Sequence, residues 1–294
     1  PMTGVAIGAG IGGLPSICAN NDAMVSRGPR RISPFMIPGC IINMTSGQLA
    51  IMKNLKGPNI AHVTACSTGL HAIGEAMHII ARGDATVMVA GGCESTIHPV
   101  GVGGFDNMHA LSRRNDDPKT ASRPFDKDRD GFVMGEGAGV LVLEELEHAR
   151  ARGARIHAEL VGFATNCDAT HITQPNSKTM RICMEEALRT AGLAPSDIGY
   201  LSAHGTATSR GDCAESNATA SLFGNRTPVS SLKSFFGHTL GACGSIEAWL
   251  AIEMMREGWF SPTINLTDID PECGELDYIT GTERRIDTEF VQSN

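Results

Sequence analysis

One cysteine and two histidines stand in sequence surroundings that suit nucleophilic chemistry. Cys66 lies in residues 59–69 (NIAHVTACSTG), between an apolar extended run and an apolar-periodic helix. A sulfur atom at such a strand-to-helix turn lies near the helix N-terminus, where unsatisfied N–H groups and the helix dipole favour a thiolate. Free cysteines more often only pack in the core, so this position alone is a weak indication.

The two histidines strengthen the interpretation of Cys66. His204 lies in residues 203–215 (AHGTATSRGDCAE), and His238 lies in residues 232–244 (LKSFFGHTLGACG). Each histidine follows a predicted strand, and such loops gather at the carboxyl ends of strands in an α/β sheet, where active sites form. Either histidine alone reads more simply as a turn or cap residue. Three such loops with small neighbours favour one site over three unrelated turns.

Strand and helix signals alternate along the chain, which predicts an α/β fold. Strands are predicted at 59–63, 85–90, 137–143, 155–162, 200–203 and 228–232. Helices are predicted at 66–81, 144–152, 177–191, 214–223 and 246–255, and a further buried helix is predicted within 35–54. The helix at 246–255 is apolar on nearly every face, so we expect it to be buried. Residues 101–107 read as a loop and residues 115–130 as a surface loop.

Composition narrows the class of protein. The 294 residues are 41% hydrophobic and carry a net charge of -8, which fits a globular protein and argues against a nucleic-acid partner. Nine cysteines are scattered without a CxxC pair, so zinc and redox-dithiol sites have little support. No signal peptide and no stretch long enough to span a membrane is visible, so a cytoplasmic location is the default.

Four motifs together carry a resemblance to a known family. They are TACSTG around Cys66, HGTATSRGDCAE around His204, KSFFGHTLGACGSIEA around His238, and RPFDKDRDGFVMGEGAG at 123–139. The chain resembles the β-ketoacyl-carrier-protein synthases, the elongating condensing enzymes of the thiolase superfamily, most closely the bacterial type II kind. The resemblance implies α/β architecture, a thiolase-like duplicated α-β-α-β-α layered sandwich. Residues 1–150 would form the half with the nucleophile, and residues 151–294 the half with both histidine motifs.

The resemblance also implies the reaction. These enzymes perform a decarboxylative Claisen condensation of an acyl thioester with malonyl-acyl carrier protein in fatty-acid elongation. Cys66 would accept the acyl group. His204 and His238 would donate hydrogen bonds through their Nε2 atoms to the enolate oxygen that forms on decarboxylation. Lys233 would set the electrostatics near the histidines. Glu247, a carboxylate in an otherwise apolar helix, needs a partner if buried and would organise the site.

Further residues take roles through the resemblance alone. Asp212 and Glu215 would hold the His204 loop, Thr206 and Thr208 would bind the pantetheine arm, and Asp168, His171 and Thr173 would lie near the malonyl entrance. Phe105 and Ile11 would line the acyl pocket. Arg30 and Arg31 would form part of a basic patch for the acidic acyl carrier protein, with His109 standing where many relatives have arginine.

The resemblance implies no organic cofactor and no catalytic metal. It implies acyl- and malonyl-loaded acyl carrier protein as partner, and a homodimer formed through the strand at about 59–64. The family's first strand–helix units would precede Pro1, and its closing glycine-rich segment, with a gating phenylalanine and an oxyanion-hole N–H, would follow Asn294. We therefore expect both ends to be cut and the isolated chain to be impaired.

Three alternatives remain open. One is a ketosynthase of type II polyketide synthesis. Another is a non-catalytic partner subunit like the chain-length factors, although those lack the nucleophile that Cys66 would supply. A third is a cysteine hydrolase, which fits Cys66 and one histidine but leaves the second histidine motif and Lys233 unexplained.

Overall fold

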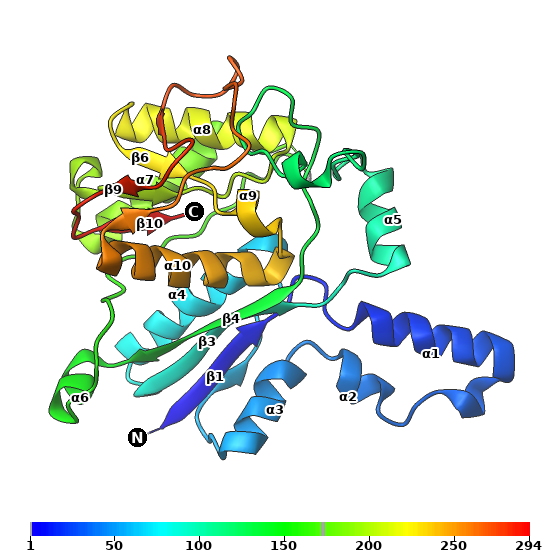
Figure 1. Ribbon diagram of the computed structural model, residues 1–294. Helices are drawn as coiled ribbons and strands as arrows, with labels where there is room; N and C mark the ends of the chain where they lie inside the picture. Colours follow the sequence, from blue (N-terminus) through cyan, green and yellow to red (C-terminus); the bar gives the residue numbers. More distant parts are fainter. Residues whose placement is uncertain (1, 172–173) are drawn as a thin grey trace. The chain divides into compact units, whose positions relative to one another are not determined.

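The computed structural model describes residues 2–171 and 174–294 and contains two compact units (Figure 1). Unit 1 comprises Pro1–Gly104, Gly135–Ile156 and Thr239–Ile246. Unit 2 comprises Phe105–Met134, His157–His238 and Glu247–Asn294. The units interleave along the sequence. The sequence predicted one half at residues 1–150 and the other at 151–294. The compact units follow a different division, so this boundary stays a prediction.

Unit 1 is built on a four-stranded sheet in the order β2-β1-β3-β4. Its strands are β1 (Thr3–Gly8), β2 (Asn59–Ile60), β3 (Val87–Glu94) and β4 (Gly137–Glu144), of which only β4 runs antiparallel to its neighbour. Its helices are α1 (Leu14–Arg27), η1 (Pro29–Arg31), α2 (Met36–Cys40), α3 (Met44–Lys53), η2 (Ala65–Ser67), α4 (Thr68–Ala81), α6 (Leu146–Ala151) and η5 (Leu240–Ala242). Helix α4 packs on β1 and β3. Strand β1 is almost wholly buried, as its near-continuous apolar run predicts for a parallel strand.

Unit 2 contains a parallel sheet in the order β10-β5-β6-β8 and a two-stranded antiparallel ribbon, β7-β9. The strands are β5 (Tyr200–Ser202), β6 (Pro228–Ser230), β7 (Trp259–Phe260), β8 (Asp277–Tyr278), β9 (Arg284–Arg285) and β10 (Val291–Ser293). The helices are η3 (Pro118–Thr120), α7 (Ser177–Ala191), η4 (Pro195–Asp197), α8 (Ser209–Phe223) and α9 (Lys233–Phe236). Helices α5 (Pro99–Asn107) and α10 (Cys243–Glu257) contain residues of both units.

Local signals explain where the main helix of unit 2 begins and ends. The Asn176 side chain accepts a hydrogen bond from the backbone N–H of Lys178 at the start of α7. Gly192 ends the helix in the left-handed conformation at φ 70°. Leu188 of this helix packs into a core with Leu201 and Val229, so α7 lies against the strands that precede the histidine loops.

Several predicted elements are confirmed. The helix expected at 66–81 is α4 with the short η2 before it, and the helix expected at 177–191 is α7. The strands expected at 85–90 and 137–143 are β3 and β4. Strand β2 is shorter than expected because only Asn59 and Ile60 pair with β1. Helix α8 begins at Ser209, five residues before the predicted start.

Two predicted elements are wrong. Residues 155–162 form no strand, because none of the described strands pairs with their backbone, and Ile156, Leu160 and Val161 are exposed. A β-type sequence without a partner strand gains no ladder hydrogen bonds. Residues 101–107, expected as a loop, belong to helix α5. The His98 ring accepts from the Val100 N–H and Pro99 begins the helix, which outweighs the glycines that follow.

Three predictions about burial are also wrong. The 35–54 segment forms α2 and α3, but Phe35 and Met52 are 75% and 74% exposed. Helix α10 exposes half of Trp249, so it is not buried on every face. The 115–130 segment is no simple surface loop, since Phe125 and Asp126 are completely enclosed. The Asp126 carboxylate forms an ion pair with Arg123, with Oδ1 3.0 Å from the guanidinium Nε. The sequence pattern does not reveal this partner.

Candidate active site

The two candidate histidines lie together in unit 2. His204 follows β5 and Ala203, and His238 follows α9 and Gly237. Their ring centroids are 5.3 Å apart, and the rings are perpendicular. The His238 N–H donates to the Val133 carbonyl at 2.7 Å, which fixes the second loop. Two loops that are distant in sequence thus present two imidazoles to the same place.

A buried ion pair lies beside His204. The Lys233 ammonium contacts Glu247 Oε1 at 2.5 Å and His204 Nδ1 at 3.4 Å. Both side chains of the ion pair are 1% exposed. An ammonium group can only donate, so Nδ1 of His204 is the acceptor and the ring proton of the neutral tautomer lies on Nε2. The contact therefore supplies a physical reason for an Nε2–H donor at this position.

Burial governs the protonation of this cluster. Burial, together with the Lys233 charge, lowers the pKa of His204 and of His238 well below the ordinary value of 6.5, so both rings are neutral at physiological pH. Burial also raises the pKa of Glu247 to about 7, although the Lys233 ammonium acts in the opposite direction. A low-dielectric interior thus disfavours an isolated charge on any of these groups. Pairing with the Glu247 carboxylate is what allows the Lys233 ammonium to stay charged there.

Glu215 organises the His204 loop from helix α8. Its two carboxylate oxygens accept hydrogen bonds from the backbone N–H groups of His204 and Gly205, at 2.7 and 2.8 Å. Asp212 lies one turn earlier and accepts from the Phe125 N–H at 2.7 Å. Burial raises the pKa of Asp212 to about 7, while backbone donors such as Phe125 hold it down. The two carboxyls anchor the start of α8 to neighbouring loops.

Cys66 belongs to unit 1, where it lies in η2 directly before helix α4. The preceding residue, Ala65, has a positive φ of 50°, a conformation that non-glycine residues adopt at a cost. Thr68 closes the turn, because its hydroxyl accepts from the Thr64 N–H at 2.9 Å. The Cys66 carbonyl accepts from the Cys243 thiol at 3.4 Å. Cys66 is half-buried, at the helix N-terminus that its sequence predicts.

Glu94 is a positioning residue that sequence reasoning missed. It ends β3 in unit 1 and is 4% exposed. Its carboxylate accepts from the backbone N–H groups of Gly10, Ile11, Gly12 and Gly241, at distances of 2.7 to 3.3 Å. This carboxylate shapes the glycine loop that carries Ile11. The only signal in the sequence is an acidic residue at the end of an apolar strand.

The other predicted residues fall into different settings. Thr206 and Thr208 share a hydroxyl hydrogen bond of 2.9 Å. Phe105 stacks edge-on with Phe132 at 5.2 Å, and Phe132 does the same with His238 at 5.3 Å, which places Phe105 one ring away from the histidine pair.

Two polar residues of the expected malonyl entrance, Asp168 and His171, lie in the segment before α7. Asp168 accepts from the Asn176 N–H at 2.8 Å and from the Thr179 hydroxyl, so it holds the start of that helix. His171 is exposed, and Thr173 lies outside the described residues.

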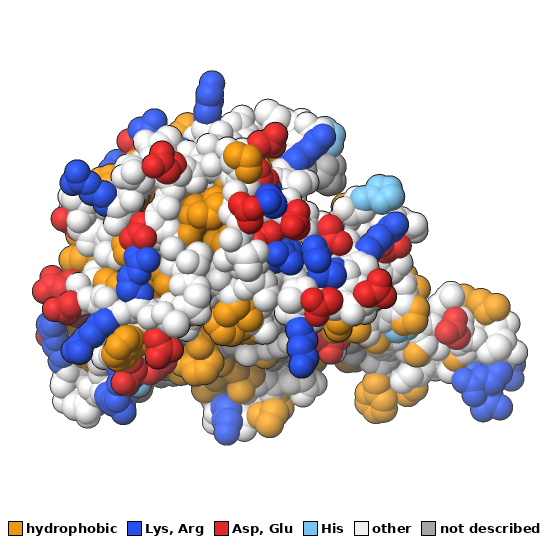
Figure 2. Space-filling model, turned by 45° about the horizontal axis from the view of Figure 1, so that its top comes forward, with side chains coloured by type: hydrophobic (Ala, Val, Ile, Leu, Met, Phe, Trp, Pro, Cys, Tyr) orange, Lys and Arg blue, Asp and Glu red, His pale blue; other side chains and the backbone are white. Residues whose placement is uncertain are grey.

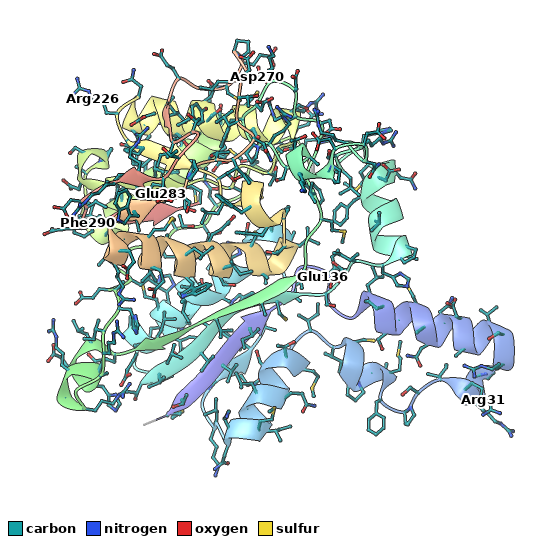
Figure 3. All side chains as sticks on the ribbon, viewed as in Figure 1. Arg31, Glu136, Arg226, Asp270, Glu283 and Phe290 are labelled. Carbon is teal, nitrogen blue, oxygen red and sulfur yellow. The ribbon has the colours of Figure 1, made fainter. Side chains whose placement is uncertain are left out.

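Arg30 and Arg31 are exposed in η1, at the far end of helix α1, where Figure 3 labels Arg31. His109 follows helix α5 with a positive φ of 54°. On the face shown in Figure 2, basic side chains are interspersed with acidic ones. Any basic patch on that face is therefore local.

Within unit 2, the side chains of Cys213, Asp270 and Cys273 offer a possible set of metal ligands, with their ligand atoms within 4.8 Å of one another. Arg129 already places its guanidinium among them, 2.6 Å from Asp270 Oδ2 and 3.1 Å from Cys213 Sγ. A second cation would be repelled there, so the donor set does not fit a metal.

Among the described residues, no helix has both the length and the apolar character that crossing a membrane requires.

Comparison with known sequences identifies both halves of the chain. Residues 1–149 match the β-ketoacyl synthase N-terminal domain, and residues 157–267 match the β-ketoacyl synthase C-terminal domain. The chain is 50% identical to 3-oxoacyl-[acyl-carrier-protein] synthase 2 of Coxiella burnetii over 299 aligned positions, which cover 100% of this chain and 72% of that protein. The resemblance noted in the four motifs is thereby confirmed.

Comparison with solved structures agrees. A β-ketoacyl synthase from Burkholderia phymatum superposes with a TM-score of 0.95 at 48% identity, covering 100% of this chain and 72% of that one. The ketosynthase in a complex described as AntDE:AntF, a type II polyketide synthase acyl-carrier protein with its ketosynthase, superposes with a TM-score of 0.91 at 34% identity, covering 97% and 72%. These matches confirm the expected thiolase-like fold. By sequence and by fold alike, the chain belongs to the β-ketoacyl synthase family.

Proposed function

We propose that the chain catalyses the decarboxylative condensation of an acyl thioester with malonyl-acyl carrier protein, the chain-extending reaction of fatty-acid elongation. The observation that carries this proposal is the neutral pair His204 and His238 beside the buried Lys233–Glu247 ion pair. The names of relatives such as the Coxiella burnetii synthase support the fatty-acid substrate class.

The first step is transfer of the acyl group to Cys66. The thiolate attacks the thioester carbon, a new carbon–sulfur bond forms, and the carrier thiolate leaves and takes up a proton. The position of Cys66 directly before α4 supports this role, because helix N-terminal N–H groups favour a negatively charged sulfur.

The second step is loss of carbon dioxide from the malonyl thioester. Breaking the carbon–carbon bond leaves an enolate whose negative charge develops on the thioester oxygen. His204 and His238 stabilise that oxygen as neutral N–H donors, and the Lys233 contact keeps the His204 proton on Nε2. The enolate carbon then attacks the acyl group on Cys66, and the cysteine thiolate leaves.

Acyl carrier protein is the partner that this reaction requires. The acyl-carrier-protein complex of the related AntDE ketosynthase supports it, and the exposed Arg30 and Arg31 are candidates for contact with an acidic carrier. A homodimer through the 59–64 segment is a further part of the proposal. It is supported by β2, which lies at the edge of the described sheet of unit 1. A cytoplasmic location stays a prediction.

The test is transfer of a radiolabelled acyl group from its carrier protein, followed by addition of malonyl-acyl carrier protein. We expect the label on Cys66 and a β-ketoacyl product, with both lost in Cys66→Ser. Cys18→Ser, which alters another half-buried cysteine of unit 1, is the matched control and should keep both. Full condensing activity in Cys66→Ser would sink the proposal.

A type II polyketide ketosynthase is a second candidate, favoured by the match to the AntDE:AntF complex. The two functions differ in the acyl chain that they extend. Saturated acyl primers extended once and released support the fatty-acid reaction. Repeated extension of an unreduced β-keto chain on the same protein would support the polyketide reaction instead.

A further inference from the structure

Two cysteines that the proposed reaction does not use lie side by side in unit 2. Cys213 lies in the early part of α8, and Cys273 lies in the turn that precedes β8. Their Sγ atoms are 3.7 Å apart although 60 residues separate them in sequence. A disulfide has a bond of about 2.05 Å, so the sulfur atoms need to approach by only about 1.7 Å. No short cysteine motif signals this pair.

The surroundings of the pair favour thiol chemistry over metal binding. Arg129 donates to Cys213 Sγ at 3.1 Å and to Asp270 Oδ2 at 2.6 Å, so a guanidinium already fills the position that a cation would take. Asp270, which Figure 3 labels, has its Oδ2 atom 4.0 Å from Cys213 Sγ. The Arg129 guanidinium lies where it can donate a hydrogen bond to the Cys213 sulfur while that sulfur reacts with an electrophilic oxidant.

The two cysteines differ in their surroundings. Cys213 lines a surface pocket together with residues of the α8 start and the loops beside it, namely Gln174, Pro175, Ser209, Arg210 and Glu272. Burial raises the pKa of Cys273 to about 12, so Cys273 is a thiol at neutral pH. Cys213 is therefore the sulfur that a small oxidant meets first, and Cys273 is the thiol in place to react second.

We propose that Cys213 and Cys273 are a peroxide-sensitive pair that oxidises to a disulfide joining α8 to the turn before β8. The Cys213 thiolate attacks one oxygen of a hydroperoxide. The O–O bond breaks, Cys213 becomes a sulfenic acid, and the other oxygen leaves as hydroxide or alkoxide. The Cys273 sulfur then attacks the Cys213 sulfur, its proton joins the departing hydroxide as water, and the S–S bond forms. The two thiols are oxidised and one peroxide is reduced, independently of the condensing reaction.

The experiment uses the whole chain with hydrogen peroxide as the probe. After oxidation the remaining thiols are alkylated. The intact mass of the protein is then measured by mass spectrometry, and its proteolytic peptides are mapped. We expect a cross-linked peptide pair containing Cys213 and Cys273, two alkylation sites fewer, and reversal by dithiothreitol. The melting temperature should rise on oxidation and return on reduction, because the bond closes a long loop. Recovery of both cysteines as alkylated thiols under conditions that oxidise other cysteines of the chain would overturn the proposal.

Variants assign the order of reaction. Cys273→Ser should leave a sulfenic acid that dimedone traps on Cys213, whereas Cys213→Ser should leave Cys273 untouched by dimedone. Cys183→Ser, which alters another half-buried cysteine of unit 2 on α7, is the matched control and should still form the cross-link. Loss of the cross-link in this control, or dimedone labelling of Cys273 in Cys213→Ser, contradicts the proposed pair. Peptide mapping of the unaltered protein decides the question if a variant fails to fold.

Discussion

The Cys66 turn and the histidine cluster are held in place by different physical means. The cysteine turn is shaped by backbone, with a positive φ at Ala65 and the Thr68 hydroxyl closing it, and Cys66 stays half-exposed. The histidine cluster is shaped by buried side chains, with an ion pair that is 1% exposed. An acyl-accepting sulfur needs access to substrate. Donors to a developing oxyanion act more strongly where water is excluded. The difference predicts that charge changes damage the second region far more than the first.

The largest effect is expected from Glu247→Ala, which leaves the Lys233 ammonium buried without its carboxylate partner. Removing one member of a buried ion pair destabilises a protein by about 3–5 kcal/mol. We expect a loss of about that size in the free energy of unfolding, measured by denaturant titration.

Glu253→Ala is the matched control for this prediction, because Glu253 lies on the same helix and pairs with Arg256 at the surface. An exposed pair of this kind contributes about 0–1 kcal/mol. Equal losses in the two variants would show that the buried Lys233–Glu247 pair contributes no more to the free energy of unfolding than an exposed pair does.

The next effect separates the two regions by chemistry. His238→Ala removes one proposed donor to the enolate oxygen and leaves the Cys66 turn intact. We expect condensation to fall by about a hundredfold, the usual loss for one oxyanion donor. Acyl transfer to Cys66, measured separately with a radiolabelled acyl group, should change much less. A parallel collapse of both reactions would mean that His238 does not act specifically in decarboxylation.

A smaller effect concerns protonation. Burial and the Lys233 charge hold the pKa of His204 and His238 below 6.5 in the folded protein. Between that folded pKa and 6.5 the unfolded chain binds more protons, so this contribution to stability is present above pH 6.5 and is lost as the pH falls. In an NMR titration, both rings should stay neutral as the pH falls through 6.5, whereas the same rings in the urea-unfolded chain should protonate there. Protonation of the folded rings at 6.5 would contradict the prediction.

The smallest effect is expected from Ala65→Gly in the cysteine turn. Glycine relieves the positive φ but costs more conformational entropy on folding, and these terms nearly cancel at about 1 kcal/mol each. The free energy of unfolding should change little, and acyl transfer to Cys66 should survive. A large loss of acyl transfer would indicate that the Ala65 methyl group itself positions the nucleophile.

Local elements were largely predictable from the sequence because their signals are local. The apolar run of β3, the helical spacing of α4 and the caps of α7 each act within a few residues. The strand expected at 155–162 failed for the opposite reason, since a strand exists only where another strand pairs with it. The same holds for the 115–130 segment, where the enclosed Asp126 depends on partners more than a hundred residues away, such as Thr267.

The site divides in the same way. The motifs around Cys66, His204 and His238 indicated the reaction class and the candidate reactive residues, because they consist of short, specific runs of sequence. Glu94 and Arg129 were missed. Each acts through contacts with segments that are distant in the chain, such as Gly10 for Glu94 and Asp270 for Arg129.

The sequence by itself determined which chemical groups this protein has and which short elements carry them. The tertiary structure alone decided that Lys233 and Glu247 are buried together, that both histidines are neutral, and that Cys213 faces Cys273. The physical reason is that burial and pairing depend on where distant segments meet. Protonation and thiol reactivity follow from that burial and from the charges it brings together.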